Sequence, residues 1–133
     1  MSLETGTQAT AQLTVSEADL ASALFQQDSD GFPPVFATAR MIGLMELAAS
    51  RVMHPLLEGD ELSVGVTVDV KHSAATPLGD LVTATATFLG MEGRLYRFEI
   101  AAEDQAGEIG RGTHLRAKVS NERLLAGCAK RRM

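Results

Sequence analysis

The chain has 133 residues, 45% of them hydrophobic, and a formal net charge of −5. This length suits one compact domain, and the acidic balance argues against a nucleic-acid-binding protein, which would carry a basic face. The single cysteine, Cys128, excludes a disulfide framework within one chain and suits a reducing cytoplasm. No apolar run reaches the length of a membrane span, so we expect no membrane association.

The N-terminal part is predicted to contain one strand and one short helix. Residues 1–10 are small and polar, and we expect them to be disordered. Alternating polar and apolar residues predict a strand over 11–15. Ser16 followed by acidic residues is typical of a helix N-terminus, and this helix should end near Phe25. Turn-forming residues predict a loop over 26–31.

The longest predicted helix runs from about residue 38 to residue 53. Pro33 and Pro34 exclude a helix just before it, and Pro55 ends it. Gly43 lies in the middle of this helix, where glycine often permits the close approach of another backbone. The apolar residues of the segment follow helical spacing: Met41, Leu44, Met45, Ala48, Ala49 and Val52.

The rest of the chain is predicted to form about four long strands joined by short turns. The alternating segments cover residues 64–72, 81–88, 95–102 and 109–119, and Asn121 would cap a last short helix over 122–130. We therefore expect one α+β domain over residues 1–133. A hotdog fold, a curved antiparallel β-sheet wrapped around one long central helix, fits this order. Periodicity alone leaves a generic α+β roll as the alternative.

No short motif with a tight pattern identifies the chemistry. The chain lacks a Walker loop, a Rossmann glycine fingerprint, a metalloprotease HExxH motif and a GxSxG nucleophile elbow. Its three histidines, His54, His72 and His114, lack the close spacing of a zinc site. We expect neither a metal nor another cofactor.

Three side chains are candidates for catalysis. Glu46 is the only carboxylate of the long helix, and it is either a solvent-facing edge residue or a working group, because an unpaired buried acid is costly. His72 falls on the valine face of the first long strand and is either a core residue or a proton carrier. Thr38 is either a simple helix N-cap or a hydroxyl placed beside free N–H groups. A hydroxyl, a carboxylate and an imidazole are the parts required for acyl transfer.

Four further residues are candidates for substrate binding. Phe32 and Phe36 flank the prolines and either anchor the chain in the core or cover an acyl pocket. Gly65 marks either a bulge or close backbone contact, or a backbone N–H that faces a ligand. Arg116, which shares its strand face with His114 and Lys118, lies either on a solvated face or where it would meet phosphates.

Colinear blocks of sequence resemble the fluoroacetyl-CoA-specific thioesterase family of hotdog-fold enzymes. These blocks are Phe-Pro-Pro-Val-Phe-Ala-Thr with Gly-Leu-Met-Glu at residues 32–46, Val-Lys-His-Ser-Ala-Ala-Thr-Pro at 70–77, Glu-Gly-Arg at 92–94 and Glu-Ile-Gly-Arg-Gly-Thr-His-Leu-Arg-Ala at 108–117. The likeness covers residues 11–120. The family pattern has a second lid phenylalanine where this chain has Ser29.

The resemblance implies a homodimer, or a tetramer, with active sites at the subunit interface. It implies hydrolysis of a short-chain acyl-CoA, substituted or halogenated acyl groups included, to a free acid and coenzyme A without a metal. It maps a catalytic triad onto Thr38, Glu46 and His72, a lid onto Phe32, a backbone contact to the acyl group onto Gly65, and an arginine on the coenzyme A side onto Arg116.

If Thr38 and Glu46 both lie within regular helix, their separation of eight positions corresponds to about 12 Å. They could then not touch, and Thr38 would have to precede the helix, or a water or a second subunit would have to join them. A catalytically silent protein that binds acyl-CoA or another small ligand is the alternative function. A dehydratase or hydratase is a third, for which the helix lacks a matching His/Asp pair.

Overall fold

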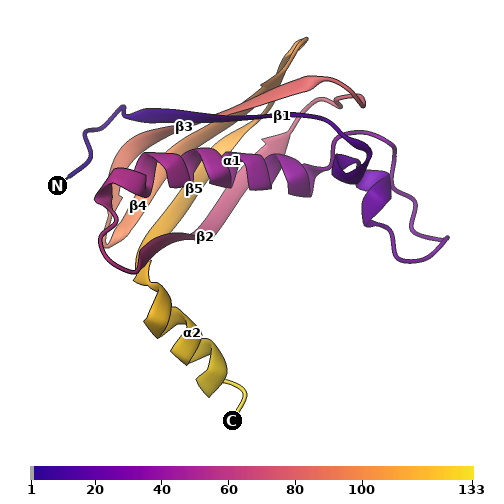
Figure 1. Ribbon diagram of the computed structural model, residues 1–133. Coiled ribbons are helices and arrows are strands. Elements are labelled where there is room, and N and C mark those ends of the chain that lie inside the picture. The colour runs from indigo at the N-terminus through magenta and orange to yellow at the C-terminus, as the bar shows by residue number, and fades with distance from the viewer. Residues whose placement is uncertain (1) are drawn as a thin grey trace.

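The computed structural model describes residues 2–133 and consists of one sheet, one long helix beside it and a terminal helix (Figure 1). In chain order the elements are β1 (Gln8–Thr14), the short 3-10 helices η1 (Glu17–Asp19) and η2 (Ala21–Leu24), α1 (Thr38–Met53), η3 (His54–Leu56), β2 (Glu61–His72), β3 (Leu81–Glu92), β4 (Leu95–Asp104), β5 (Gly107–Ser120) and α2 (Asn121–Lys130).

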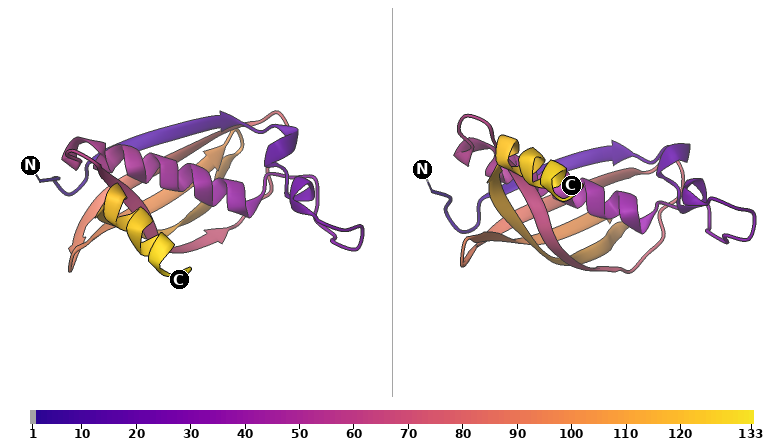
Figure 2. Two further views of the ribbon diagram at one scale, coloured as in Figure 1. Left: turned by 60° about the horizontal axis from the view of Figure 1, so that its bottom comes forward. Right: turned by 90° about the horizontal axis from the view of Figure 1, so that it is seen from below.

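The five strands form one antiparallel sheet in the order β1-β3-β4-β5-β2. The sheet curves around α1, which lies along its inner face (Figure 2). Successive side chains of a strand point to opposite faces of the sheet, so every second residue of β3 lies on the inner, apolar face. The buried residues of β3 are Val82, Ala84, Ala86 and Phe88. A curved sheet around a central helix is the hotdog architecture that the element order predicted.

The long helix α1 has the bounds expected from its sequence, and most of its apolar face is completely buried. Burying an apolar side chain of this size contributes about 1.5–3 kcal/mol relative to leaving it exposed, which anchors the helix to the sheet. The close approach of another backbone expected at Gly43 is absent within residues 2–133, where no atom outside the helix lies within 4 Å of a Cβ built at this position. The buried residues of α1 are Met41, Leu44, Met45, Ala48, Ala49, Val52 and Met53.

Strand β2 departs from simple alternation at a bulge. Its pairing with β5 shifts between Gly65 and Thr67, so Val66 is an extra residue and is half exposed. Before the bulge Gly65 faces the helix, and after it Val68 packs against the core. Alternation predicted that Val66 would share one face with the other valines of the strand, and this prediction is wrong. The bulge instead places both Gly65 and His72 on the inner face.

Both ends of the chain differ from the sequence-based expectation. The N-terminal segment is not disordered from residue 8 onward, because β1 begins at Gln8 and pairs with β3; Met1 lies outside the described residues. The predicted short helix consists of the two 3-10 turns η1 and η2. The last helix is capped by Ser120 rather than Asn121, and it projects from the end of β5 (Figure 1). No helix among residues 2–133 is long and apolar enough to cross a membrane.

Candidate active site

A hydroxyl and an imidazole meet where α1 begins and β2 ends. Thr38 is the first residue of α1, and the N-cap is Ala37 rather than the expected Thr38. The Thr38 Oγ1 atom lies 2.7 Å from Nδ1 of His72. If the hydroxyl donates to Nδ1, the neutral ring carries its proton on Nε2. Sequence analysis placed these two residues among the catalytic candidates, and the fold brings them into contact.

The other ring nitrogen of His72 has no partner within the described chain. Nε2 is buried and makes no hydrogen bond to any of residues 2–133. Burial lowers the pKa of His72, and a backbone hydrogen bond at Ala74 opposes this shift. A buried polar atom without a partner is uncommon in folded proteins, and it indicates a place for a group from outside the chain.

An apolar groove of about 410 Å³ adjoins this pair. Phe32 stands at the groove with 52% of its surface exposed, which fits a side chain that covers a ligand. Phe36 is only 1% exposed and belongs to the core, and because it also lines the groove, its contact with an acyl group stays a prediction. The groove is lined by Ala21, Phe32, Pro33, Val35, Phe36, Thr38, His72, Ser73, Ala74 and Ala75.

Glu46 does not join Thr38 and His72 within one chain. The chain from Thr38 to Glu46 is regular helix throughout, so the Cα atom of Glu46, eight positions later, lies about 12 Å further along the axis. Its side chain is 39% exposed, and Oε2 lies 3.3 Å from Nη1 of Arg116. The expected partnership of Glu46 with His72 is therefore absent within the described chain.

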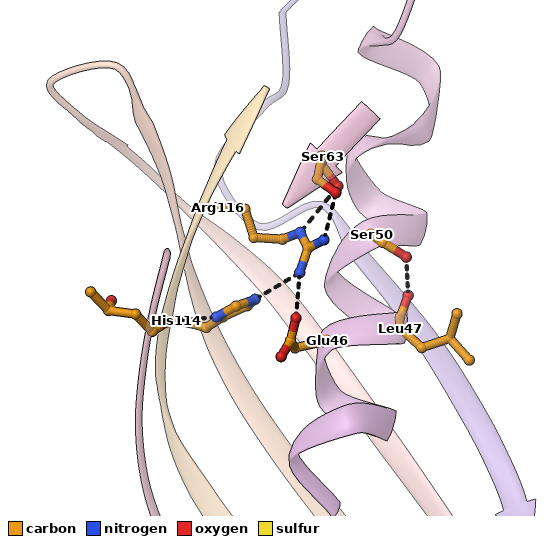
Figure 3. Close-up of polar contacts among 7 residues, drawn as sticks. Glu46, Leu47, Ser50, Ser63, His114 and Arg116 are labelled. Carbon is orange, nitrogen blue, oxygen red and sulfur yellow. Dashed lines mark hydrogen bonds and ion pairs between the residues drawn. The ribbon is translucent and has the colours of Figure 1, made fainter. Parts of the chain in front are cut away.

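Arg116 is buried rather than exposed on a solvated strand face. Only 4% of the residue is accessible, and its guanidinium donates to the side chain and carbonyl of Ser63, to His114 and to Glu46 (Figure 3). Burial lowers the pKa of Arg116, and the Glu46 carboxylate opposes that shift. Because these donors are occupied within the chain, the contact of Arg116 with coenzyme A stays a prediction.

Gly65 provides the space that the Glu46 carboxylate occupies. A Cβ atom at Gly65 would lie 2.8 Å from Oε2 of Glu46 and 3.2 Å from Cε1 of His114. Such contacts would force the carboxylate to move, so a side chain at this position is incompatible with the observed geometry. Of the interpretations of Gly65, the bulge is present, and the close neighbours of this glycine are side chains rather than another backbone. Its contact with an acyl group stays a prediction.

Sequence reasoning missed two residues of this cluster. No pattern in the sequence singles out Ser63, and His114 stands out only as one of three histidines and as a neighbour of Arg116. The spacing of His114 and Arg116, two residues apart on one strand, placed both on the same face, but nothing in the pattern showed that this face is buried. Within residues 2–133 no group of three or more His, Cys, Asp or Glu side chains is arranged to hold a metal ion.

A curved sheet around a central helix, with a threonine–histidine pair in an apolar groove, defines a protein of the hotdog-fold thioesterase class. The sequence profile of the fluoroacetyl-CoA-specific thioesterases matches residues 15–122, and the chain belongs to this family. A fluoroacetyl-CoA thioesterase from Streptantibioticus cattleyicolor is 48% identical over 95 residues, which are 71% of this chain and 68% of that protein.

Solved structures agree with this assignment. A solved structure of the fluoroacetyl-CoA thioesterase FlK superposes with a TM-score of 0.91 at 38% identity, and 98% of each chain is covered. A hot-dog-like protein from Thermanaerovibrio acidaminovorans superposes with a TM-score of 0.82 at 28% identity over 96% of this chain and 91% of that one. A thioesterase superfamily member from Thermus thermophilus, at 24% identity and a TM-score of 0.86, shares the fold.

Proposed function

We propose that this protein hydrolyses a short-chain acyl-CoA to a free acid and coenzyme A, with halogenated acyl groups such as fluoroacetyl among its substrates. The observation that carries the proposal is the 2.7 Å contact between Thr38 and His72 beside an apolar groove. Membership of a thioesterase family and the similarity to a fluoroacetyl-CoA thioesterase support the same reaction.

His72 acts as the general base in this proposal. Its Nδ1 accepts the proton of the Thr38 hydroxyl, or of a water held by that hydroxyl, while the oxygen attacks the thioester carbonyl. The carbon–sulfur bond then breaks, and the proton is passed to the departing coenzyme A thiolate. If Thr38 itself attacks, water hydrolyses the resulting threonine ester in a second step. Burial that lowers the pKa of His72 keeps the ring neutral, as a base must be.

The start of α1 is suited to stabilise the negative charge that develops on the carbonyl oxygen. The first N–H groups of a helix have no acceptor within the helix and lie at its positive end. At Thr38 and Ala39 these groups lie beside the attacking hydroxyl, where an oxyanion would form. The backbone N–H of Gly65 is the second candidate for contact with the acyl group.

A second copy of the chain would complete the site. Strand β2 is an edge of the sheet, with β5 on one side and no strand of the described chain on the other. Unpaired strand edges readily pair with another chain. Antiparallel pairing of two β2 strands, centred about midway between Gly65 and His72, would bring Glu46 of the partner subunit toward the unpaired Nε2 of His72.

In that arrangement Glu46 plays the part of the acid in a hydroxyl–imidazole–carboxylate triad. It would accept the Nε2 proton, orient the ring and stabilise the imidazolium formed during attack. We therefore propose a homodimer, with a tetramer of such dimers as the alternative, and a reaction that needs no metal or other cofactor. The exposed free thiol of Cys128 suits a cytoplasmic location.

The test is a panel of acyl-CoA thioesters with the release of free thiol monitored. It should contain acetyl-, fluoroacetyl-, propionyl- and butyryl-CoA, together with crotonyl-CoA to detect hydration of a double bond. Wild-type protein should release thiol from at least one saturated substrate in the presence of a chelator, and Glu46→Gln and His72→Ala should each lower the rate by at least about 100-fold. If the protein binds the acyl-CoAs without hydrolysing them, the hydrolase hypothesis is wrong and the catalytically silent binding protein is the better account.

A further inference from the structure

His114 is a fully buried histidine that the proposed reaction does not use. It lies on β5 with 0% of its surface exposed. Its Nδ1 is 2.7 Å from the carbonyl oxygen of Thr67, and its Nε2 is 3.0 Å from Nη1 of Arg116. A carbonyl can only accept and a guanidinium can only donate. The ring must therefore be neutral, with its proton on Nδ1 and a lone pair on Nε2.

The charges around His114 are compatible with the neutral ring. Burial lowers its pKa most, and the charge of Arg116 lowers it further, while the Thr67 carbonyl and Glu46 oppose the shift. On the β4 side the ring faces Phe98, with ring centroids 6.4 Å apart. An imidazolium here would direct an N–H at the Arg116 guanidinium, which has no lone pair to receive it.

Arg116 is held on both sides, and one hydrogen of its Nη1 remains for Glu46. Its Nε donates to Oγ of Ser63 at 3.1 Å, and Nη2 donates to the Ser63 carbonyl at 2.9 Å. One hydrogen of Nη1 goes to His114, and the other goes to Oε2 of Glu46 at 3.3 Å (Figure 3). The direction of the Glu46 contact is therefore set by Ser63 on β2 and by His114 on β5.

We propose that His114 is a positioning residue for Glu46. As the Nδ1–H tautomer it accepts a hydrogen bond from Arg116, and this bond fixes the guanidinium so that its remaining Nη1 hydrogen holds the Glu46 carboxylate. The inference rests on the proposed hydrolase function, in which Glu46 works on the site of a partner subunit. A carboxylate displaced by even 1 Å would lower the rate by about 100-fold.

Two substitutions separate the acceptor role of His114 from its role in packing. In His114→Gln the amide oxygen can replace Nε2 as the acceptor for Arg116, whereas the Thr67 carbonyl loses its donor. In His114→Asn the shorter amide can still donate to Thr67, but Arg116 loses its acceptor. We expect kcat to fall about tenfold to 100-fold in His114→Asn with KM changed little, and His114→Gln to retain most of the wild-type kcat. Equal losses in two folded variants, or the reverse order, would overturn the proposal.

Nitrogen-15 NMR of the imidazole rings tests the tautomer of His114 directly in the wild-type protein. His114 should show a protonated Nδ1 and an unprotonated Nε2 at pH 7, and its signals should be assigned by their loss in His114→Gln or His114→Asn. An Nε2–H tautomer or an imidazolium in an active enzyme would overturn the role of His114 alone. A wild-type protein inert toward every acyl-CoA with the expected tautomer would instead overturn the hydrolase function.

If neither His114 variant folds, Ser63→Ala weakens the opposite anchor of Arg116 while leaving the Ser63 carbonyl in place. Loss of the 3.1 Å bond to Nε should lower kcat severalfold with an unchanged KM. An unchanged kcat in folded Ser63→Ala would contradict the requirement that Arg116 be held in one orientation.

Discussion

Oγ1 of Thr38 lies 2.7 Å from Nδ1 of His72, which joins the first residue of α1 to the last residue of β2. The contact spans 34 residues of sequence and exists only because the sheet curves around the helix. It leaves Nε2 of His72 buried and unpaired within the described chain. A hydroxyl on one nitrogen and an unpaired second nitrogen are compatible with the proposed triad, in which the acid comes from a second copy of the chain.

The Thr38 hydroxyl should be required for turnover. Thr38→Ala removes the group that either attacks the thioester or holds the water, so kcat should fall by about 100-fold or more. Thr38→Ser keeps the hydroxyl and should retain activity within about tenfold of wild type. Steady-state kinetics on the best substrate of the panel measure both. A Thr38→Ala variant with wild-type kcat would remove this residue from the mechanism.

The pH profile of kcat should respond to the Glu46 carboxylate. Burial within one chain lowers the pKa of His72 from its usual value of 6.5, whereas the carboxylate of Glu46 of the partner subunit would raise that pKa. The acidic limb of the kcat profile should therefore move to lower pH in Glu46→Gln, whose residual activity depends on a ring shifted by burial alone. An acidic limb at the same pH in the wild type and in Glu46→Gln would argue against the contact between His72 and Glu46.

The same shifts predict how stability depends on pH. The pKa values of His72 and His114 are both lowered in the folded chain, so the unfolded chain binds more protons below pH 6.5. Above pH 6.5 the two histidines are neutral in both states, and the free energy of unfolding has its full value. It decreases as the pH falls from their pKa in the unfolded chain to their lower pKa in the folded chain. Urea unfolding at pH 7 and pH 5 measures this. Replacing His114 with Gln should reduce the difference between the two pH values.

Gly65→Ala should reduce activity through Glu46. The new methyl group would lie 2.8 Å from Oε2 of Glu46, so the carboxylate must move and kcat should fall at least about tenfold. Gly43→Ala is the matched control on α1, where nothing lies within 4 Å of the added carbon. It should raise the free energy of unfolding by about 1 kcal/mol, because alanine favours helix over glycine. Equal effects of the two substitutions on kcat would count against the crowding argument.

The two phenylalanines near the groove should behave differently. Phe36 is 1% exposed in the core, so Phe36→Ala should lower the free energy of unfolding by about 3–5 kcal/mol. Phe32 is half exposed at the groove, so Phe32→Ala should change that free energy by less than about 1 kcal/mol and act on KM or on the choice of acyl group. Denaturant unfolding and the acyl-CoA panel separate the two roles. A strongly destabilising Phe32→Ala would place Phe32 in the core.

Much of the fold could be predicted from the sequence because its periodicity is strong. The prolines before Thr38 and the regular apolar spacing after it predicted the bounds of α1, and alternation predicted the buried face of β3. Glycine at position 65 indicated a bulge as one of its interpretations, but the valine alternation continues through Val66, so the pattern alone could not show that the register shifts there. Strand pairing also ordered residues 8–10, which are too polar for their composition alone to indicate a strand.

The candidate site was only partly predictable for a physical reason. Thr38 and His72 could be singled out by their chemistry, but their contact depends on the curvature of the sheet. The burial of Arg116 was not predicted, because a charged residue on a strand usually faces solvent. Its burial depends on donors and acceptors contributed by β2 and β5 together, and no local pattern in either strand shows that these groups meet.

The central claim is that Thr38 and His72 of one copy work with Glu46 of a second, and mixing two inactive variants tests it most directly. Glu46→Gln and His72→Ala should each be inactive alone. After co-refolding in equal amounts, half of the dimers should be mixed, and each mixed dimer should contain one intact site of two, which restores about a quarter of wild-type activity. If all three residues acted within one chain, every site would carry a defect, and the mixture would stay as inactive as its components.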